Sequence, residues 1–161
     1  MKVTIYTDGA ARGNPHGPGG YGCILHYRDL GGRLHEREFS GGYRKTTNNR
    51  MEMLAVIVGL EALTKPCEVT VVSDSKYVTD AFNQYWLDNW QKKNWKTSTG
   101  KPVKNKQLWL RMLEAVKPHP KVEFQWIKGH AGHPENERCD QLATSAADGE
   151  NLPEDDLGDE T

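Results

Sequence analysis

Residues 3–9 read VTIYTDG and residues 69–75 read VTVVSDS, and the two stretches share one pattern. Each is a run of β-branched and apolar residues that ends in an aspartate, Asp8 in the first and Asp74 in the second. Such runs favour buried strands. If the two strands are parallel neighbours, both aspartates lie at one edge of the sheet, where α/β proteins place ligand sites. Either aspartate alone is also a common turn former or helix cap.

Around these two strands, the period of the apolar residues predicts a mixed α/β fold. Three antiparallel strands come first, and the Gly- and Pro-rich residues 12–20 are expected to be turn throughout. The expected elements are strands at 3–7, 21–27 and 33–40, a helix at 48–63, a strand at 68–73, helical segments within 75–90, a helix at 105–116, a strand at 122–127 and a helix from Pro134.

The charge of the chain is unevenly distributed. Its 161 residues include 21 Lys and Arg and 22 Asp and Glu, which gives a formal net charge of −1. Seven of these acids and none of the bases lie at 148–161, so residues 1–147 carry 21 bases and 15 acids, a net charge of +6. Near-neutrality therefore does not exclude a nucleic acid as partner. We expect residues 1–147 to form one domain and residues 148–161 to be an acidic, disordered tail.

The cysteines and the hydropathy of the chain indicate the cellular compartment of the protein. Cys23, Cys67 and Cys139 are widely spaced and form neither a disulfide framework nor a zinc ribbon, so they predict reduced thiols in a cytoplasmic protein. The N-terminal residues lack the apolar segment of a signal peptide, and no 18 apolar residues run together. We expect no membrane association, and a monomer.

Two further acids stand in segments with apolar helical faces. Glu52 is the only charged residue within 51–58, and a buried carboxylate without a partner is costly, so it requires a cation, a metal ion or a cleft. A capping interaction with the amide of Asn48 or Asn49 is the alternative. Asp140 adjoins the apolar face of the last helix, where a charge at the helix flank is the common alternative.

If Asp8, Glu52, Asp74 and Asp140 converge, their negative charges need compensation. Hard divalent cations provide it, and an all-oxygen ligand set favours Mg²⁺, with Mn²⁺ as a substitute, over zinc. Two such ions can activate a water and stabilise the leaving oxygen in phosphodiester hydrolysis. The four carboxylates therefore indicate phosphoryl chemistry.

His130 is a candidate for proton transfer or product release. It lies between Gly129 and Ala131, in a segment whose glycines favour movement, and histidine titrates near neutrality. Together with His133 and Cys139 it fits no closed zinc site.

A basic segment at about residues 86–106, named here the basic handle, predicts a nucleic-acid-binding surface. It has six lysines and no acid between Gln91 and Lys106. Cations and flat rings suit a phosphate backbone and its sugars, whereas a solvated charged surface and a tryptophan core are the alternatives. The candidate residues are Trp86, Trp90, Lys92, Lys93, Trp95 and Lys96.

Six short motifs occur along the chain in a fixed order. They are TDG at 7–9, GNPHGPGGYG at 13–22, TTNNRME at 46–52, SDS at 73–75, WKT at 95–97 with KPVKN at 101–105, and KGHAGHPENERCD at 128–140. Taken together, over roughly residues 2–147, they closely resemble bacterial ribonuclease H type 1.

The resemblance implies a five-stranded mixed sheet flanked by helices, with three antiparallel strands followed by two parallel ones. It also implies an endonuclease that cuts the RNA strand of an RNA–DNA hybrid with two metal ions and leaves 5′-phosphate and 3′-OH ends. By position, Asp8, Glu52, Asp74 and Asp140 match the metal-binding carboxylates of the family, and His130 matches the histidine of a flexible loop.

The resemblance further implies where the substrate binds. The basic handle matches a protrusion that follows the DNA strand, and a phosphate of that strand binds at positions matched by Thr47 and Asn105. Two positions depart from the family pattern: Lys45 stands where an arginine often completes the phosphate pocket, and Lys76 replaces an uncharged residue. Contacts with the RNA strand near its 2′-hydroxyls fall on Asn14, Asn48 and Asn49.

Two other classes of function are considered. A catalytically silent hybrid-binding module would lack a carboxylate, and none of the four is missing. A related nuclease or integrase acting on DNA would have no 2′-OH to bind, so the amides Asn14, Asn48 and Asn49 argue against it. The acidic tail lies outside the resemblance, and the sequence leaves open whether it screens the basic handle.

Overall fold

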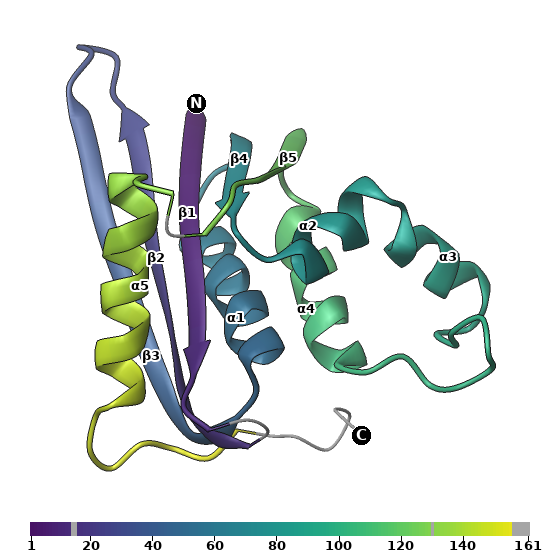
Figure 1. The fold of residues 1–161 in the computed structure, drawn as a ribbon. Coiled ribbons are helices and arrows are strands. Elements are labelled where there is room, and N and C mark those ends of the chain that lie inside the picture. The colour runs from purple at the N-terminus through teal and green to yellow at the C-terminus, as the bar shows by residue number, and fades with distance from the viewer. Residues whose placement is uncertain (14–15, 130, 156–161) are drawn as a thin grey trace.

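The computed structural model describes residues 1–13, 16–129 and 131–155. In these ranges five strands form one sheet in the order β3-β2-β1-β4-β5 (Figure 1). β1 and β3 each pair antiparallel with β2, whereas β4 is parallel to both β1 and β5. The predicted mixed sheet is confirmed. The strands are β1 (Lys2–Ala11), β2 (Gly17–Arg28), β3 (Leu34–Thr46), β4 (Glu68–Ser73) and β5 (Lys121–Trp126).

Helices cover both faces of the sheet. Figure 1 shows α5 on one face and α1 with α4 on the other, while α3 and the loop after it project away from the sheet. No helix in the described ranges is long and apolar enough to cross a membrane. The helices are α1 (Asn48–Glu61), α2 (Lys76–Asn83), α3 (Trp86–Lys92), α4 (Lys106–Val116) and α5 (Pro134–Ala147).

The pairing of β1 with β4 aligns the two similar stretches of sequence. Tyr6 lies opposite Val72 in the parallel register, so Asp8 and Asp74, each two residues later, come to the same edge of the sheet. β1 itself runs past the predicted strand at 3–7, because its last residues continue to pair with β2.

The helix α1 is buried on several sides, as its sequence predicts. β3 continues past its predicted end at residue 40 to Thr46, and α1 begins two residues later with Thr47 as its N-cap. Ten of its 14 residues are buried. Two of them are charged: Arg50 and Glu52 are each only 3% exposed. Charges buried this deeply require partners.

The prediction of a turn throughout residues 12–20 was wrong, because residues 17–20 belong to β2. Packing against α5 explains why glycines stand in this strand. A Cβ at Gly20 would lie 2.2 Å from a carbonyl oxygen of α5, and a Cβ at Gly22 would lie 2.6 Å from that of Cys139. Glycine therefore lets the helix pack directly on the backbone of the strand.

Candidate active site

Three carboxylates converge at the edge of the sheet. Asp8 in β1, Glu52 in α1 and Asp74 after β4 each offer an oxygen, and the three oxygens lie within 4.8 Å of one another. Asp8 and Glu52 are buried, and Asp74 is half-buried. The parallel strands bring the two aspartates together, and the packing of α1 on β1 adds the glutamate.

The backbone of Gly9 holds two members of this acidic cluster. Its N–H donates to Glu52 Oε1 at 2.6 Å and to Asp8 Oδ1 at 2.9 Å. A Cβ at Gly9 would lie 2.4 Å from the Glu52 nitrogen, so the close approach requires glycine. The Gly9 contact occupies Oε1 in place of the capping interaction considered from sequence. The second oxygen, Glu52 Oε2, is buried without a hydrogen-bond partner among the described residues.

Burial and like charge both act on the acids of this cluster. The pKa of Asp8 is raised from 3.8 to about 7, chiefly by burial, and the charges of Asp74 and Asp140 act in the same direction. Burial also raises the pKa of Glu52 well above its usual value, and the charges of Asp8 and Asp74 add to this effect. Burial and like charge thus favour the protonated carboxyls, and a cation bound there would favour the ionised forms.

Asp140 borders the acidic cluster without joining its closest group. It lies half-buried in α5, and its charge reaches Asp8 strongly enough to raise the pKa of that residue. The neighbouring Cys139 is fully buried and donates from Sγ to the Tyr6 carbonyl at 3.3 Å, which anchors this turn of the helix to β1. The fourth predicted acid is therefore on the same side of the molecule as the other three.

The residues of the acidic cluster fit a divalent metal ion. All of the donors are carboxylate oxygens, which hard cations prefer. Glu52 Oε2 is buried and has no partner among the residues that the structure describes, and burial raises the pKa of Asp8 and of Glu52. Asp8, Glu52 and Asp74 are the residues that could hold such an ion.

Two predicted residues, Asn14 and His130, lie outside the described residues. The chain next to His130 does approach the acidic cluster, because a Cβ at Gly129 would lie 2.8 Å from Asp74 Oδ2. Trp126 supports the same region by donating from its indole N–H to the Asp74 carbonyl at 3.0 Å.

Lys76 lies at the start of α2, two residues after Asp74. Its side chain is exposed, and Nζ lies 4.7 Å from the centroid of the Trp126 ring. This cation–π contact holds the ammonium group over an aromatic face. It places a positive charge beside the acidic cluster rather than within it.

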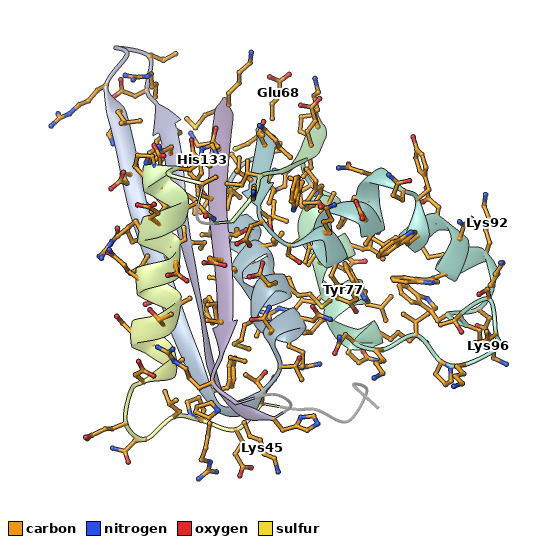
Figure 2. The ribbon with its side chains drawn as sticks, viewed as in Figure 1. Lys45, Glu68, Tyr77, Lys92, Lys96 and His133 are labelled. Carbon is orange, nitrogen blue, oxygen red and sulfur yellow. The ribbon has the colours of Figure 1, made fainter. Side chains whose placement is uncertain are left out.

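In the basic handle the tryptophans are packed and the predicted substrate-binding lysines are exposed. The rings of Trp86, Trp90 and Trp95 are half-buried and pack in a row, and Trp90 also contacts the buried Trp109, so they share in the core. The lysines are exposed, and Figure 2 shows Lys92 and Lys96 on the handle away from the sheet. A hollow of about 350 Å³ is lined by Trp86, Asn89, Trp90, Lys93, Lys96, Thr97 and Ser98.

The remaining predicted residues gather around the start of α1. Asn48 and Asn49 are exposed in its first turn, Lys45 is exposed at the end of β3, and Thr47 is buried as the N-cap. Asn105 comes to the same place from α4. It precedes that helix with φ of 62° and is only 2% exposed.

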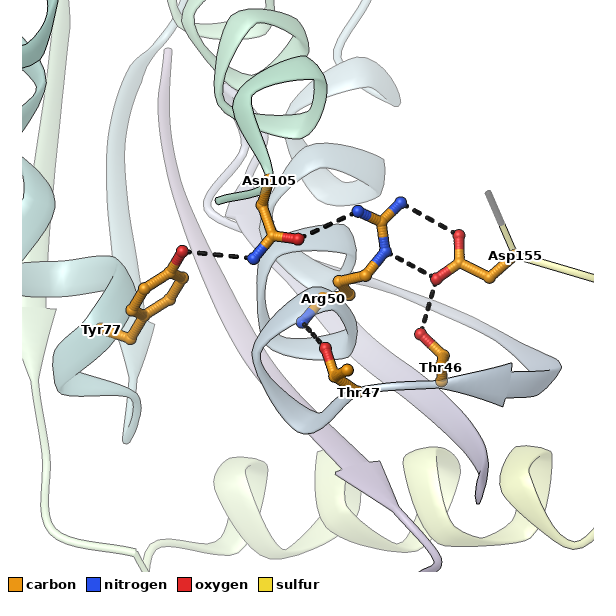
Figure 3. Close-up of polar contacts among 6 residues, drawn as sticks. All are labelled: Thr46, Thr47, Arg50, Tyr77, Asn105 and Asp155. Carbon is orange, nitrogen blue, oxygen red and sulfur yellow. Dashed lines mark hydrogen bonds and ion pairs between the residues drawn. The ribbon is translucent and has the colours of Figure 1, made fainter. Parts of the chain in front are cut away.

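A polar network that sequence reasoning missed includes two of these residues, Thr47 and Asn105 (Figure 3). Arg50 donates from Nη1 to Asn105 Oδ1 at 3.0 Å, and Asn105 donates to the Tyr77 hydroxyl at 3.2 Å. On its other side, Arg50 binds Asp155, which Thr46 also contacts. The one available signal was a cation next to the apolar run of α1, because such a cation needs a buried partner.

Known proteins resemble this chain along nearly its whole length. The RNase H family model matches residues 1–148. A ribonuclease H of Lachnoclostridium phytofermentans is 67% identical over 157 residues, which cover 98% of this chain and 99% of that protein. One from Yersinia pestis (strain Pestoides F) is 54% identical, with coverage of 98% and 96%.

Solved structures share the fold. The crystal structure of LC9-RNase H1, described as a type 1 RNase H with the type 2 active-site motif, matches with a TM-score of 0.81 and 34% identity. The match covers 91% of this chain and 72% of that one. LC11-RNase H1 in complex with RNA/DNA hybrid matches with a TM-score of 0.64 and 29% identity, covering 91% and 96%.

Proposed function

The chain belongs to the ribonuclease H family, and from this membership we propose that it is an endonuclease that hydrolyses the RNA strand of RNA–DNA hybrids. The observation that carries the proposal is the acidic cluster of Asp8, Glu52 and Asp74, three carboxylates within 4.8 Å at the carboxyl edge of parallel strands. A type 1 relative with the same fold was solved in complex with RNA/DNA hybrid.

The metal is Mg²⁺, with Mn²⁺ as a substitute, since both prefer carboxylate oxygens. Asp8, Glu52 and Asp74 hold it, and Asp140 completes the ligand set from α5. Two such ions, when bound, supply an activated water and stabilise the leaving oxygen, so that cleavage leaves 5′-phosphate and 3′-OH ends. The chain contributes a rigid frame, in which the Gly9 N–H fixes one oxygen of Glu52 and leaves the other for the metal.

The RNA strand is read at the start of α1. Asn48 and Asn49 are exposed there, only one helical turn from Glu52, so their amides can bind a ribose 2′-hydroxyl next to the metal. Duplex DNA has no such group. Asn14 is assigned to the same strand and His130 to proton transfer or product release, both from the family resemblance.

The DNA strand is held by charge on two surfaces. Lys45, Thr47 and Asn105 bind one phosphate beside α1, and Lys76, exposed at the start of α2, is assigned to substrate binding. The exposed lysines of the basic handle follow the backbone further along, with tryptophans beneath them. The handle residues assigned to this strand are Trp86, Trp90, Lys92, Lys93, Trp95 and Lys96.

Two features of the chain support a cytoplasmic monomer. Cys23, Cys67 and Cys139 are free, buried thiols, which supports a cytoplasmic location. The acidic cluster is built within one chain, so a monomer is the acting species.

The test offers labelled RNA–DNA hybrid, duplex RNA and duplex DNA with Mg²⁺ to the native chain and to Asp8→Asn. We expect the native chain to cut only the RNA strand of the hybrid, and to lose this activity when a chelator removes the metal. Asp8→Asn should be inactive. Cleavage of duplex DNA, or undiminished hybrid cleavage by the variant, would overturn the proposal.

A further inference from the structure

The last described residues of the chain, 148–155, turn back onto the domain; we name them the C-terminal segment. Acids of this segment form ion pairs with three arginines, which lie in the loop after β1, in β3 and in α1. A backbone hydrogen bond from Arg44 N–H to the Pro153 carbonyl at 2.8 Å adds to them. The pairs are Arg12 with Asp148, Arg44 with Glu154 and Arg50 with Asp155.

The pair of Arg50 with Asp155 differs from the other two in its burial. Its side chains are only 4% and 6% exposed, whereas those of Arg44 and Glu154 are 63% and 78% exposed. Asp155 Oδ2 accepts from Arg50 Nε at 2.7 Å and from the Thr46 hydroxyl at 2.6 Å, and Oδ1 accepts from Arg50 Nη2 at 3.1 Å. Two oxygens of one anion thus meet two parallel N–H donors.

This arrangement is an anion site with a fixed donor set. Asn105 holds the guanidinium of Arg50 from the far side, and Tyr77 holds Asn105 in turn (Figure 3). The same fork of donors binds a phosphate as readily as a carboxylate. Thr46 lies next to Thr47 and Arg50 contacts Asn105, so the site adjoins the pocket proposed above for a phosphate of the DNA strand.

We propose that Asp155 occupies this site as an internal substitute for a nucleic-acid phosphate, so that the C-terminal segment competes with the hybrid for Arg50 and Thr46. The proposal rests on the proposed function for the identity of the competitor. Binding of the hybrid displaces the carboxylate, and a backbone phosphate takes its hydrogen bonds. The segment therefore lowers the affinity of the resting protein.

The energetics allow this exchange. One anion replaces another, so Arg50 keeps a charged partner throughout and no buried charge is stranded. The other two ion pairs of the segment are exposed and stabilise it little, and ordering the segment loses chain entropy, so the buried pair of Arg50 with Asp155 is what mainly holds it. An apparent Kd rises in inverse proportion to the fraction of protein that is open, so we expect the segment to weaken binding by roughly three- to tenfold.

The test compares Asp155→Asn with Glu150→Gln in the full chain. Glu150 is exposed and makes no side-chain contact among the described residues, so its variant removes the same charge without touching the site. Binding of labelled hybrid is measured by anisotropy in a chelator, at about 50 mM and about 200 mM salt. Thermal melts of both variants check that they fold.

Asp155→Asn should tighten binding by roughly three- to tenfold at both salt concentrations, because a buried pair is screened little. Glu150→Gln should tighten binding only at low salt, and by less. Equal effects of the two variants would mean that the net charge of the segment, and not the contact of Asp155 with Arg50, weakens binding, and this would overturn the proposal. So would unchanged or weaker binding by Asp155→Asn, or a variant that no longer folds, since Asp155 would then be structural.

A second measurement follows Arg50 directly. The Arg50 Nε–H resonance of the native chain should shift when hybrid is added, and it should reach the position found for Asp155→Asn with hybrid. An Arg50 signal that hybrid leaves unchanged would contradict displacement. Cleavage of the hybrid by the native chain tests the proposed function separately, so the two can fail independently.

Discussion

Arg50 and Glu52 lie two residues apart in α1 and are buried to the same extent, yet their surroundings are opposite. The guanidinium of Arg50 is matched by Asn105 on one side and by Asp155 on the other. Glu52 has one oxygen on the Gly9 N–H and one oxygen without a described partner, and the acids around it repel it.

The comparison shows that the neighbours of a buried charged residue indicate its role. Where the chain supplies the counter-ion, as for Arg50, the charge holds distant segments together and can exchange its partner for another anion. Where the chain gathers like charges, as around Glu52, the folded state is complete only with a cation from outside. Burial alone would not have separated the two residues.

The largest effect is expected where the charge belongs to the metal site. Glu52→Gln keeps the shape of the side chain but removes a metal-binding charge, and should lower the rate of hybrid cleavage by roughly 10³-fold. Glu68→Gln is the matched control, because Glu68 is exposed at the amino end of β4, away from the acidic cluster (Figure 2). Comparable losses in both variants would contradict the assignment of Glu52.

An intermediate effect is expected for Arg50, whose counter-ion is supplied by the chain itself. Arg50→Ala should lower the free energy of unfolding by about 3 kcal/mol, because the buried Asn105 loses its donor and Asp155 its partner. Urea unfolding measures this change. Arg111→Ala is the control: its pair with Glu61 is largely exposed, so about 0–1 kcal/mol is expected. Similar values for both would mean that the Arg50 network does not stabilise the fold.

The smallest effect is expected for Asp8, where removing the charge should make the folded chain more stable. The folded pKa of Asp8 is about 7 against an ordinary 3.8, so between these values the folded chain binds more protons than the unfolded chain. Stability in a chelator must therefore fall as the pH rises through this window. Asp8→Asn should reduce that loss without abolishing it, because burial also raises the pKa of Glu52. Above about pH 7 the variant should be more stable than the native chain by roughly 2 kcal/mol.

Thermal melts of both chains in a chelator at about pH 5 and about pH 8 provide the measurement for Asp8→Asn. Adding Mg²⁺ at the higher pH should raise the melting temperature of the native chain but hardly that of the variant, since a ligand stabilises only the state that binds it. If the native chain instead became more stable as the pH rises in the chelator, the pKa of Asp8 would not be raised in the folded state.

The sequence was most informative where a pattern repeated. The two stretches that end in Asp8 and Asp74 predicted a shared edge on the condition that their strands are parallel neighbours, and the register of β1 with β4 shows that they are. Glu52 was predicted to be a site residue because a buried acid among apolar residues requires a cation, a metal ion or a cleft. These inferences needed only local patterns and one assumption about neighbouring strands.

Other features could not be predicted because they depend on distant packing. The glycines of residues 17–20 favour turns locally, but pairing with β1 and contact with α5 place them in a strand. The partner of Arg50 is more than 100 residues away in the chain, and no pattern links the two. The disorder predicted for the acidic tail rested on composition, which does not reveal that residues 148–155 meet three arginines.

The packing of α5 on bare backbone has an evolutionary consequence. Gly20 and Gly22 carry no reactive group, yet the absence of their side chains sets how closely the helix bearing Asp140 lies against β2. A methyl group at either position would force that helix outward and would displace Asp140, the proposed fourth ligand, which tolerates little movement. Selection for the proposed activity would therefore act on these two inert positions as it would on Asp140 itself.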